Sequence, residues 1–183
     1  MNINEITDMY YNAVVNLEKY LKTQKENIDE LHFESNDNKK QLYKVIHYWW
    51  YDTFCNSLKP YMSWKSSEKM NYDQLKEVFT KGDLEQINHY LIIRDVLDDF
   101  LSESAGNSLT TYYEKNGQDI DDDSVIREII EESSSLITKE KIDSKIYPEE
   151  IVELHSIAHQ FYNACNYLED YYKQNMNKKD IEM

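Results

Sequence analysis

Residues 148–174, PEEIVELHSIAHQFYNACNYLEDYYKQ, carry the most regular pattern of the chain and decide its fold class. Apolar side chains recur there at steps of three and four residues, the spacing that gathers them on one face of an α-helix. This apolar stripe consists of Ile151, Leu154, Ala158, Phe161, Cys165, Leu168 and Tyr172. Pro148 suits a first helical turn, and Glu149 and Glu150 suit the positive end of a helix dipole. The pattern predicts a long helix that needs a packing partner along its whole length.

The composition of the 183-residue chain also favours helices. It contains 3 glycines and 2 prolines, whereas β-rich folds need both residue types in their turns. The 16 tyrosines, 5 phenylalanines and 3 tryptophans indicate a largely aromatic core, with tyrosine hydroxyls that reach water or an acceptor at its edge. A chain of this size buries roughly 70% of the surface that its unfolded form exposes, so it needs no disulfide or metal to fold.

Similar patterns predict further helices earlier in the chain. The first is expected over residues 4–25 and the second over residues 36–58. The apolar face of the first consists of Ile6, Tyr10, Ala13, Leu17 and Tyr20. Two long helices of the same kind at opposite ends of the chain, this one and the helix over 148–174, are expected to pack against each other.

Residues 71–106 predict a short helix followed by a long one. The short helix is expected to start at Asn71 and to end where Gly82 adopts a left-handed conformation. Asp83 and Gln86 then match a capping box that begins the long helix. We expect Gly106 to stop this helix.

The region after Gly106 is less regular. Residues 107–122 suit a short helix or an extended piece, and Asp123 or Ser124 is expected to cap another helix. The apolar face of that helix would consist of Ile126, Ile129, Ile130, Ser133, Leu136 and Ile137. We therefore predict an all-α, single-domain helical bundle over residues 1–176, with about five main helices plus one or two short ones, and a frayed tail over residues 177–183.

The net charge of −15 restricts the classes of molecule that the chain is expected to bind. A protein this acidic repels nucleic acid and anionic membranes, so basic protein surfaces or metal ions are its expected partners. The arginines are Arg94 and Arg127, which leaves little capacity for phosphate recognition by arginine forks. The chain has 2 cysteines, no signal-peptide pattern and no apolar run close to the ~18 residues of a membrane span. These features predict a cytoplasmic location.

Acidic residues form two groups on neighbouring predicted helices. They are Asp95, Asp98, Asp99 and Glu103 in the first group and Asp121, Asp122, Asp123, Glu131 and Glu132 in the second. One interpretation is a solvated surface that supplies solubility and helix caps. The other, which we favour for function, is an electrostatic surface for a basic partner. Mimicry of nucleic acid would need several helices to present acids together, because acids one turn apart are about 6 Å apart whereas duplex DNA carries one charge per roughly 1.7 Å.

The run from His47 to Tyr51 is aromatic on all sides of its predicted helix. Trp49, Trp50 and Tyr51 therefore belong to the core or, if exposed, form an aromatic anchor for a partner. We include these three residues in the predicted partner-binding site.

Histidines suggest a first alternative. His155 and His159 are four residues apart and so share one helical edge, while His47 lies on another predicted helix. Two such histidines and a third from a facing helix resemble the metal sites of DinB-like helical proteins, which implies a helical metal-binding protein. The other interpretation is purely structural: both histidines border the apolar stripe, and their ring nitrogens face water.

Glutamate pairs suggest a second alternative. Glu128 and Glu131 form an ExxE pair on one predicted helix, and Glu150 and Glu153 form another on the next. This arrangement resembles all-α nucleotide pyrophosphatases of the MazG and dimeric dUTPase type, although Glu153 stands where that family usually has aspartate. The resemblance implies a Mg²⁺-dependent nucleotide hydrolase in which the four carboxylates hold the metal.

No catalytic residue is predicted, because the chain lacks the GxxxxGK[ST], GxGxxG and GxSxG motifs. No helix carries a basic face that would read DNA. We predict a small cytoplasmic interaction protein without a cofactor that binds and inhibits or neutralises a basic partner, such as a nucleic-acid-binding protein. Immunity proteins, antitoxins and phage anti-defence inhibitors are the classes that fit.

Overall fold

The structure, a computed structural model, describes the backbone of residues 1–30 and 72–182 and the side chains of residues 1–24 and 72–175. These parts contain five α-helices and one 3₁₀ turn and no strand, so the predicted all-α fold is confirmed. The helix predicted over residues 36–58 lies outside the described residues, and so do His47, Trp49, Trp50 and Tyr51. None of the described helices is both long and apolar enough to cross a membrane.

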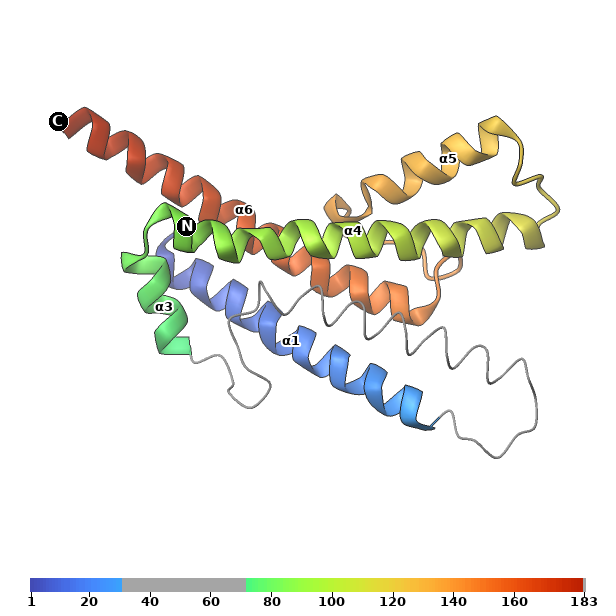
Figure 1. Ribbon diagram of the computed structural model, residues 1–183, viewed down its shortest axis with the longest axis horizontal. Coiled ribbons are helices and arrows are strands. Elements are labelled where there is room, and N and C mark those ends of the chain that lie inside the picture. The colour runs from blue at the N-terminus through green and yellow to red at the C-terminus, as the bar shows by residue number, and fades with distance from the viewer. Residues whose placement is uncertain (31–71, 183) are drawn as a thin grey trace.

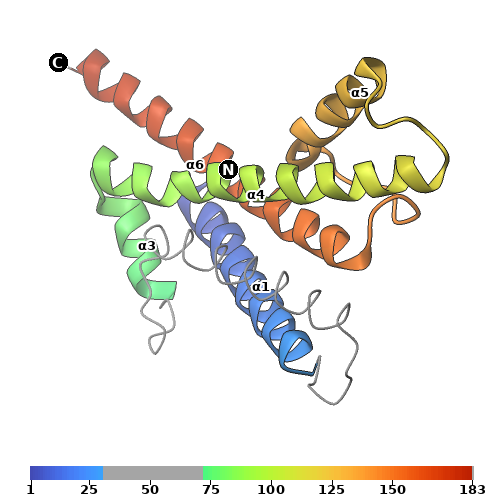
Figure 2. The same ribbon diagram turned by 45° about the vertical axis from the view of Figure 1, so that its right-hand side comes forward.

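The long C-terminal helix is the central element. α6 (Glu149–Glu182) packs against α1 (Ile3–Glu30) and against α4 (Leu84–Lys115), as Figures 1 and 2 show. α3 (Tyr72–Lys81) packs mainly against α1. The predicted pairing of the first and last long helices is therefore confirmed, and α4 covers the other side of α6.

The remaining elements lie along the second half of α4. α5 (Asp123–Ser134) packs against α4, and the 3₁₀ turn η1 (Leu136–Thr138) contacts both α4 and α6. In Figures 1 and 2, α5 runs beside α4 on the side away from α1. α5 and α6 make no direct helix–helix contact in the parts of the chain that are described.

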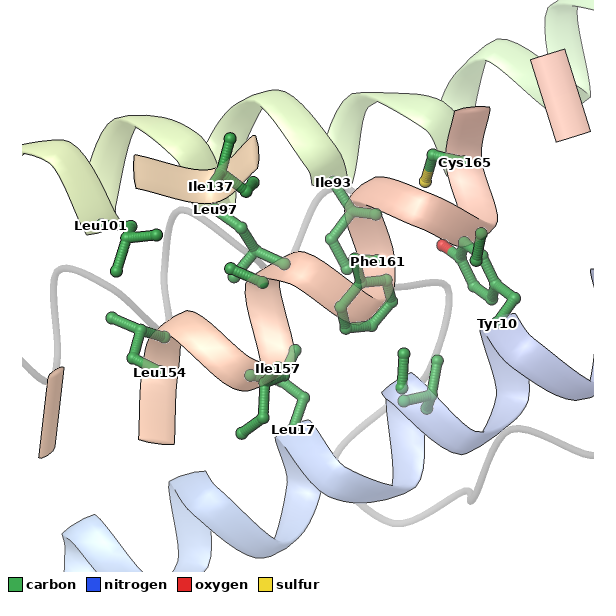
Figure 3. Packing of buried hydrophobic residues seen from close by; sticks show 14 of the residues in the cluster. Tyr10, Leu17, Ile93, Leu97, Leu101, Ile137, Leu154, Ile157, Phe161 and Cys165 are labelled. Atoms are coloured by element: carbon green, nitrogen blue, oxygen red, sulfur yellow. The ribbon is translucent and has the colours of Figure 1, made fainter. Parts of the chain in front are cut away.

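The apolar stripe of α6 forms the middle of the core. Its positions from Ile151 to Leu168 are buried, as predicted, and Tyr172 is half-buried with its hydroxyl donating a 2.6 Å hydrogen bond to the Phe79 carbonyl. Figure 3 shows side chains of α6 between those of α1 and α4. The labelled neighbours are Tyr10 and Leu17 on α1 and Ile93, Leu97 and Leu101 on α4. The predicted face of the first helix, from Ile6 to Tyr20, is buried as well.

α4 does not stop at Gly106, so that prediction was wrong. The helix continues to Lys115, and its C-cap is Asn116, followed by Gly117 at a φ of 76°. Gly106 instead faces α5: a Cβ there would lie 3.8 Å from the Ser133 hydroxyl oxygen. The packing of α5 against this part of α4 stabilises a helical turn at a position where the sequence alone predicts the end of the helix.

The connection between α3 and α4 also differs from its prediction at one residue. Gly82 does not have a positive φ. Its N–H donates a 2.7 Å hydrogen bond to the Val78 carbonyl, and a Cβ at position 82 would lie 2.3 Å from the same oxygen. Glycine is needed here for close approach rather than for handedness. Asp83 caps α4 as predicted, accepting a 2.9 Å hydrogen bond from the Gln86 N–H.

α5 is rotated relative to its predicted face. Its N-cap is Asp122 rather than Asp123 or Ser124, and the helix ends at Ser134. Leu136 and Ile137 therefore reach the core from η1 and not from the helix. The face of α5 that lies toward α4 consists of Val125, Ile129 and Ser133, whereas the side chains of Ile126 and Ile130 are 40% and 60% exposed.

The end of α6 also lies beyond its predicted boundary. The helical backbone continues to Glu182, through residues 177–182 that were expected to belong to a frayed tail. The residue types in this stretch, mainly Lys, Asp and Glu, do not include the glycine or proline that would end a helix.

Substitution of two glycines by alanine tests the helix geometry. Gly106→Ala should raise the free energy of unfolding by about 0.5–1 kcal/mol, because alanine has the higher helix propensity and its Cβ meets only ordinary contacts. Gly82→Ala should lower it by about 1–3 kcal/mol, because its Cβ collides with the backbone of α3. Urea unfolding followed by circular dichroism measures both. Destabilisation by Gly106→Ala would contradict the continuous helix.

Candidate functional site

The acids of α4 divide into exposed and half-buried members. Asp95, Asp99 and Glu103 are exposed and recur at steps of four, so they follow one face of the helix. Asp98 is half-buried, and its Oδ1 atom is enclosed without a hydrogen-bond partner. Burial, followed by the charges of Asp99 and Asp95, raises the pKa of Asp98. Asp98 therefore lies at the edge of the acidic face and not on its open part.

Arg94 neutralises part of this face. Its guanidinium donates hydrogen bonds of 2.7 Å to Asn166 Oδ1 and 3.1 Å to Glu169 Oε2 on α6, and its Nε lies 3.6 Å from Asp95 Oδ1. These contacts make Arg94 a cross-link between α4 and α6. Asp95 thus has a cation beside it, whereas Asp99 and Glu103 form no ion pair with another described residue.

The acids before α5 include a structural cap. The Asp122 carboxylate accepts hydrogen bonds from the Ser124 N–H at 2.9 Å and from the Ser124 hydroxyl at 2.7 Å. These hydrogen bonds lower the pKa of Asp122. Asp121 and Asp123 are exposed on either side of it and take part in no ion pair within the described parts of the chain. The cap orders the turn, and its two neighbours present their charge to solvent.

The acids within α5 also have different roles. Glu132 is half-buried and forms a 3.3 Å ion pair with Lys139. Burial, followed by the charge of Glu132, raises the pKa of Tyr147. Glu132 therefore belongs to the packing around Tyr147. Glu131 is exposed and has no ion-pair partner among the residues that the structure describes.

The exposed acids of the two groups lie on adjoining elements. Gly106 of α4 faces Ser133 of α5, and the two helices pack against each other, so the two acidic groups belong to adjoining helices. Within these two groups, the exposed acids without an ion-pair partner in the described residues are Asp99, Glu103, Asp121, Asp123 and Glu131. The aromatic part of the predicted site, Trp49, Trp50 and Tyr51, lies outside the described residues.

His155 and His159 form hydrogen bonds to main-chain carbonyl groups. This differs from the structural alternative given above, in which their ring nitrogens face water. His155 Nε2 lies 2.7 Å from the Lys139 carbonyl oxygen and His159 Nδ1 lies 2.8 Å from that of Ile137. A carbonyl can only accept, so both nitrogens donate. The second nitrogen of His159 lies 3.2 Å from the Asn163 amide nitrogen, which donates to it. The two rings stack at 5.8 Å and hold the segment after α5 against α6.

The histidine metal site is not assembled by the described residues. Hydrogen bonds engage both ring nitrogens of His159 and Nε2 of His155, and the third predicted ligand, His47, lies outside the described residues. The described parts of the chain hold no group of three or more histidine, cysteine, aspartate or glutamate side chains that could bind a metal ion.

The described residues do not bring the two glutamate pairs together either. Glu128 lies beside Tyr113 of α4. Burial is the largest cause that raises the pKa of Tyr113, and the charge of Glu128 is the next. Glu150 and Glu153 lie beside Tyr20 of α1, whose hydroxyl donates to the Glu150 carbonyl at 3.4 Å. Glu131, Glu128's pair partner, is exposed on α5, which does not contact α6 in the described structure. The two pairs therefore do not converge on one magnesium ion, because α5 packs on α4 alone among the long helices.

Two surface features were not predicted. One is the exposure of Ile126 and Ile130 on α5, which hydrophobicity along the sequence assigns to the core. The other is an open groove of about 290 Å³ between α1 and α6. Its lining consists of Asn16, Lys19, Tyr20, Thr23, Glu153, Ser156, Ile157 and Gln160. No pattern in the sequence marks this groove, because its walls come from two helices that are far apart in the chain.

These observations define an all-α protein with exposed acids on adjoining helices and no metal-binding cluster in the described residues. Comparison with protein-family models, curated proteins and solved structures found no match to the chain.

The buried histidine predicts a pH dependence of stability. Burial lowers the pKa of His155 in the folded protein, so the unfolded chain takes up this proton first. The neutral ring contributes fully to the free energy of unfolding above the ordinary histidine pKa of about 6.5. This contribution is lost as the pH falls from there toward the lowered pKa of His155 in the folded protein. Between pH 7.5 and 5, the free energy of unfolding should fall by at most about 1.4 kcal/mol per pH unit more in the wild type than in His155→Gln.

Urea titrations at several pH values measure this difference. The comparison with His155→Gln removes the effects that both chains share, above all the change in their acidic self-repulsion. Parallel pH profiles for the two chains would show that His155 carries no proton-linked stability.

Proposed function

We propose that this is a small acidic interaction protein that binds a basic partner protein and blocks the surface it covers. The observation that supports the proposal is the set of exposed acids on α4 and before and within α5 that lack an ion-pair partner in the described structure. Unpaired charges of one sign repel one another within the protein, and a cationic partner relieves that repulsion.

The charge arrangement supports fast and selective association more than tight binding. The exposed acids lie on α4 and α5, which pack against each other, and the net charge of the chain is −15. Salt screens each exposed charge over a Debye length of about 8 Å at physiological ionic strength, so the attraction acts on a cation once it is near the surface. Such complementarity raises association rates and disfavours acidic partners.

The partner class follows from the same electrostatics. Proteins that bind nucleic acid carry the basic surfaces that an acidic protein can cover, so they are the favoured partners. Inhibition of such a partner in the cytoplasm is the role of immunity proteins, antitoxins and phage anti-defence inhibitors. Partial mimicry of nucleic acid would be the means of competition, with the acids of α4 and α5 in place of phosphates.

Charge reversal tests the proposal. A triple variant with Asp99, Glu103 and Asp121 changed to lysine should capture at least about tenfold less basic partner from an extract of the native host. The matched control changes Glu77, Glu140 and Asp170 to lysine, which are exposed acids elsewhere with the same total change in charge. Quantitative affinity purification at two salt concentrations measures capture, and thermal unfolding confirms that both variants fold.

The two variants separate surface from net charge. Loss of capture in the first triple variant alone supports the acidic surface. Equal loss in both would assign binding to net charge without a defined surface, and full capture by both would overturn the proposal.

A further inference from the structure

α5 exposes two neighbouring isoleucines. Ile126 and Ile130 are 40% and 60% exposed, and their spacing of four residues places them one above the other on the same side of the helix. Large aliphatic side chains are usually buried, so two adjacent exposed ones on a short helix form a notable apolar surface. Among the described helices, α5 contacts only α4 and the 3₁₀ turn η1.

The opposite flank of α5 is occupied. Val125, Ile129 and Ser133 form the line that faces α4, and Glu128 and Glu132 lie beside Tyr113 on one side of this line. At 100° per residue, about the turn of an α-helix, Ile126 and Ile130 fall on the other side. The same geometry places Asp123 close to the isoleucines on the solvent side, with Arg127 and Glu131 beyond.

We propose that Ile126, Ile130 and Asp123, here called the isoleucine flank, dock a basic amphipathic helix of the partner. The isoleucines receive apolar side chains of that helix, while Asp123 faces a lysine or arginine beside them. The inference rests on the proposed function and names the part of the partner that this surface recognises. Two apolar anchors one helical turn apart match the spacing with which amphipathic helices present their own anchors.

Charge decides between a basic partner and a second copy of this chain. Two copies that met through the isoleucine flank would bring Asp123 of one molecule close to Asp123 of the other. Each copy carries a net charge of −15, so self-association opposes a strong like-charge repulsion. A basic helix replaces that repulsion with attraction, and Arg127 is the sole cation of α5 that would oppose it.

The test uses the full chain and two synthetic peptides of equal composition. One peptide is a helix of about four turns with leucines on one face and lysines beside them, and the other has the same residues in scrambled order without an apolar face. Fluorescence anisotropy of the labelled peptides measures binding to the wild type and to variants.

Two double variants are compared. Changing Ile126 and Ile130 to serine should weaken binding of the amphipathic peptide by about tenfold or more, since these side chains are the anchors. The matched control changes Leu84 and Ile92 to serine, which are 47% and 36% exposed on α4, and should bind as the wild type does. The scrambled peptide should bind more weakly to the wild type and equally to both double variants.

Each contrary outcome has a defined meaning. Wild-type affinity in the Ile126 and Ile130 variant, or equal loss in the α4 control, overturns the isoleucine flank. The triple lysine variant of Asp99, Glu103 and Asp121 then shows whether the proposed function also fails, because that variant leaves the flank intact. A dimer of the wild type in sedimentation, dissolved by the two serines, would make a second copy the occupant and overturn the basic helix.

Discussion

The fold depends on the aromatic contacts of Tyr10. Its ring lies 5.3 Å from that of Phe161 on α6 and 5.2 Å from that of Phe79 on α3, both edge to face. Its hydroxyl donates a 3.1 Å hydrogen bond to the Tyr90 carbonyl of α4. One side chain of α1 therefore contacts three other helices. Burial raises the pKa of this hydroxyl, so it stays a protonated donor at physiological pH. Aromatic pairs of this geometry contribute about 0.5–1.5 kcal/mol each beyond burial.

The position of α5 follows from this core. α1 and α4 already cover α6, so α5 packs only against the second half of α4 and against η1 in the described structure. The hydrogen bonds of His155 and His159 then fix the segment that returns from α5 to α6. A helix that packs on one neighbour buries only a narrow line of residues. The outer sides of α5 thus remain exposed even though its sequence contains several aliphatic residues.

Periodicity predicted those helices whose apolar stripe has one unambiguous direction. In α1 and α6 the polar residues mark the opposite face, so the buried residues from Ile6 to Tyr20 and from Ile151 to Leu168 could be named in advance. In α5, Ile126 and Ile129 are both apolar, and only the contact with α4 decides which one is buried. Gly106 was misjudged because tertiary packing overrides a local stop signal. Whether the glutamate pairs converge could not be predicted, because spacing along the chain does not tell which helices meet.

The acids show why charge alone does not define a binding surface. Asp122 caps a helix, Glu132 pairs with Lys139, and Asp95 lies beside Arg94, so local structure uses part of the charge that the sequence displays. The remaining exposed acids act through solvent, where an ion pair contributes about 0–1 kcal/mol and is screened by salt. In the proposed complex, affinity would therefore come mainly from apolar anchors that become buried on binding, with the acids setting rate and selectivity. In the described structure, α5 is where two exposed aliphatic side chains lie one helical turn apart, with an exposed acid, Asp123, beside them.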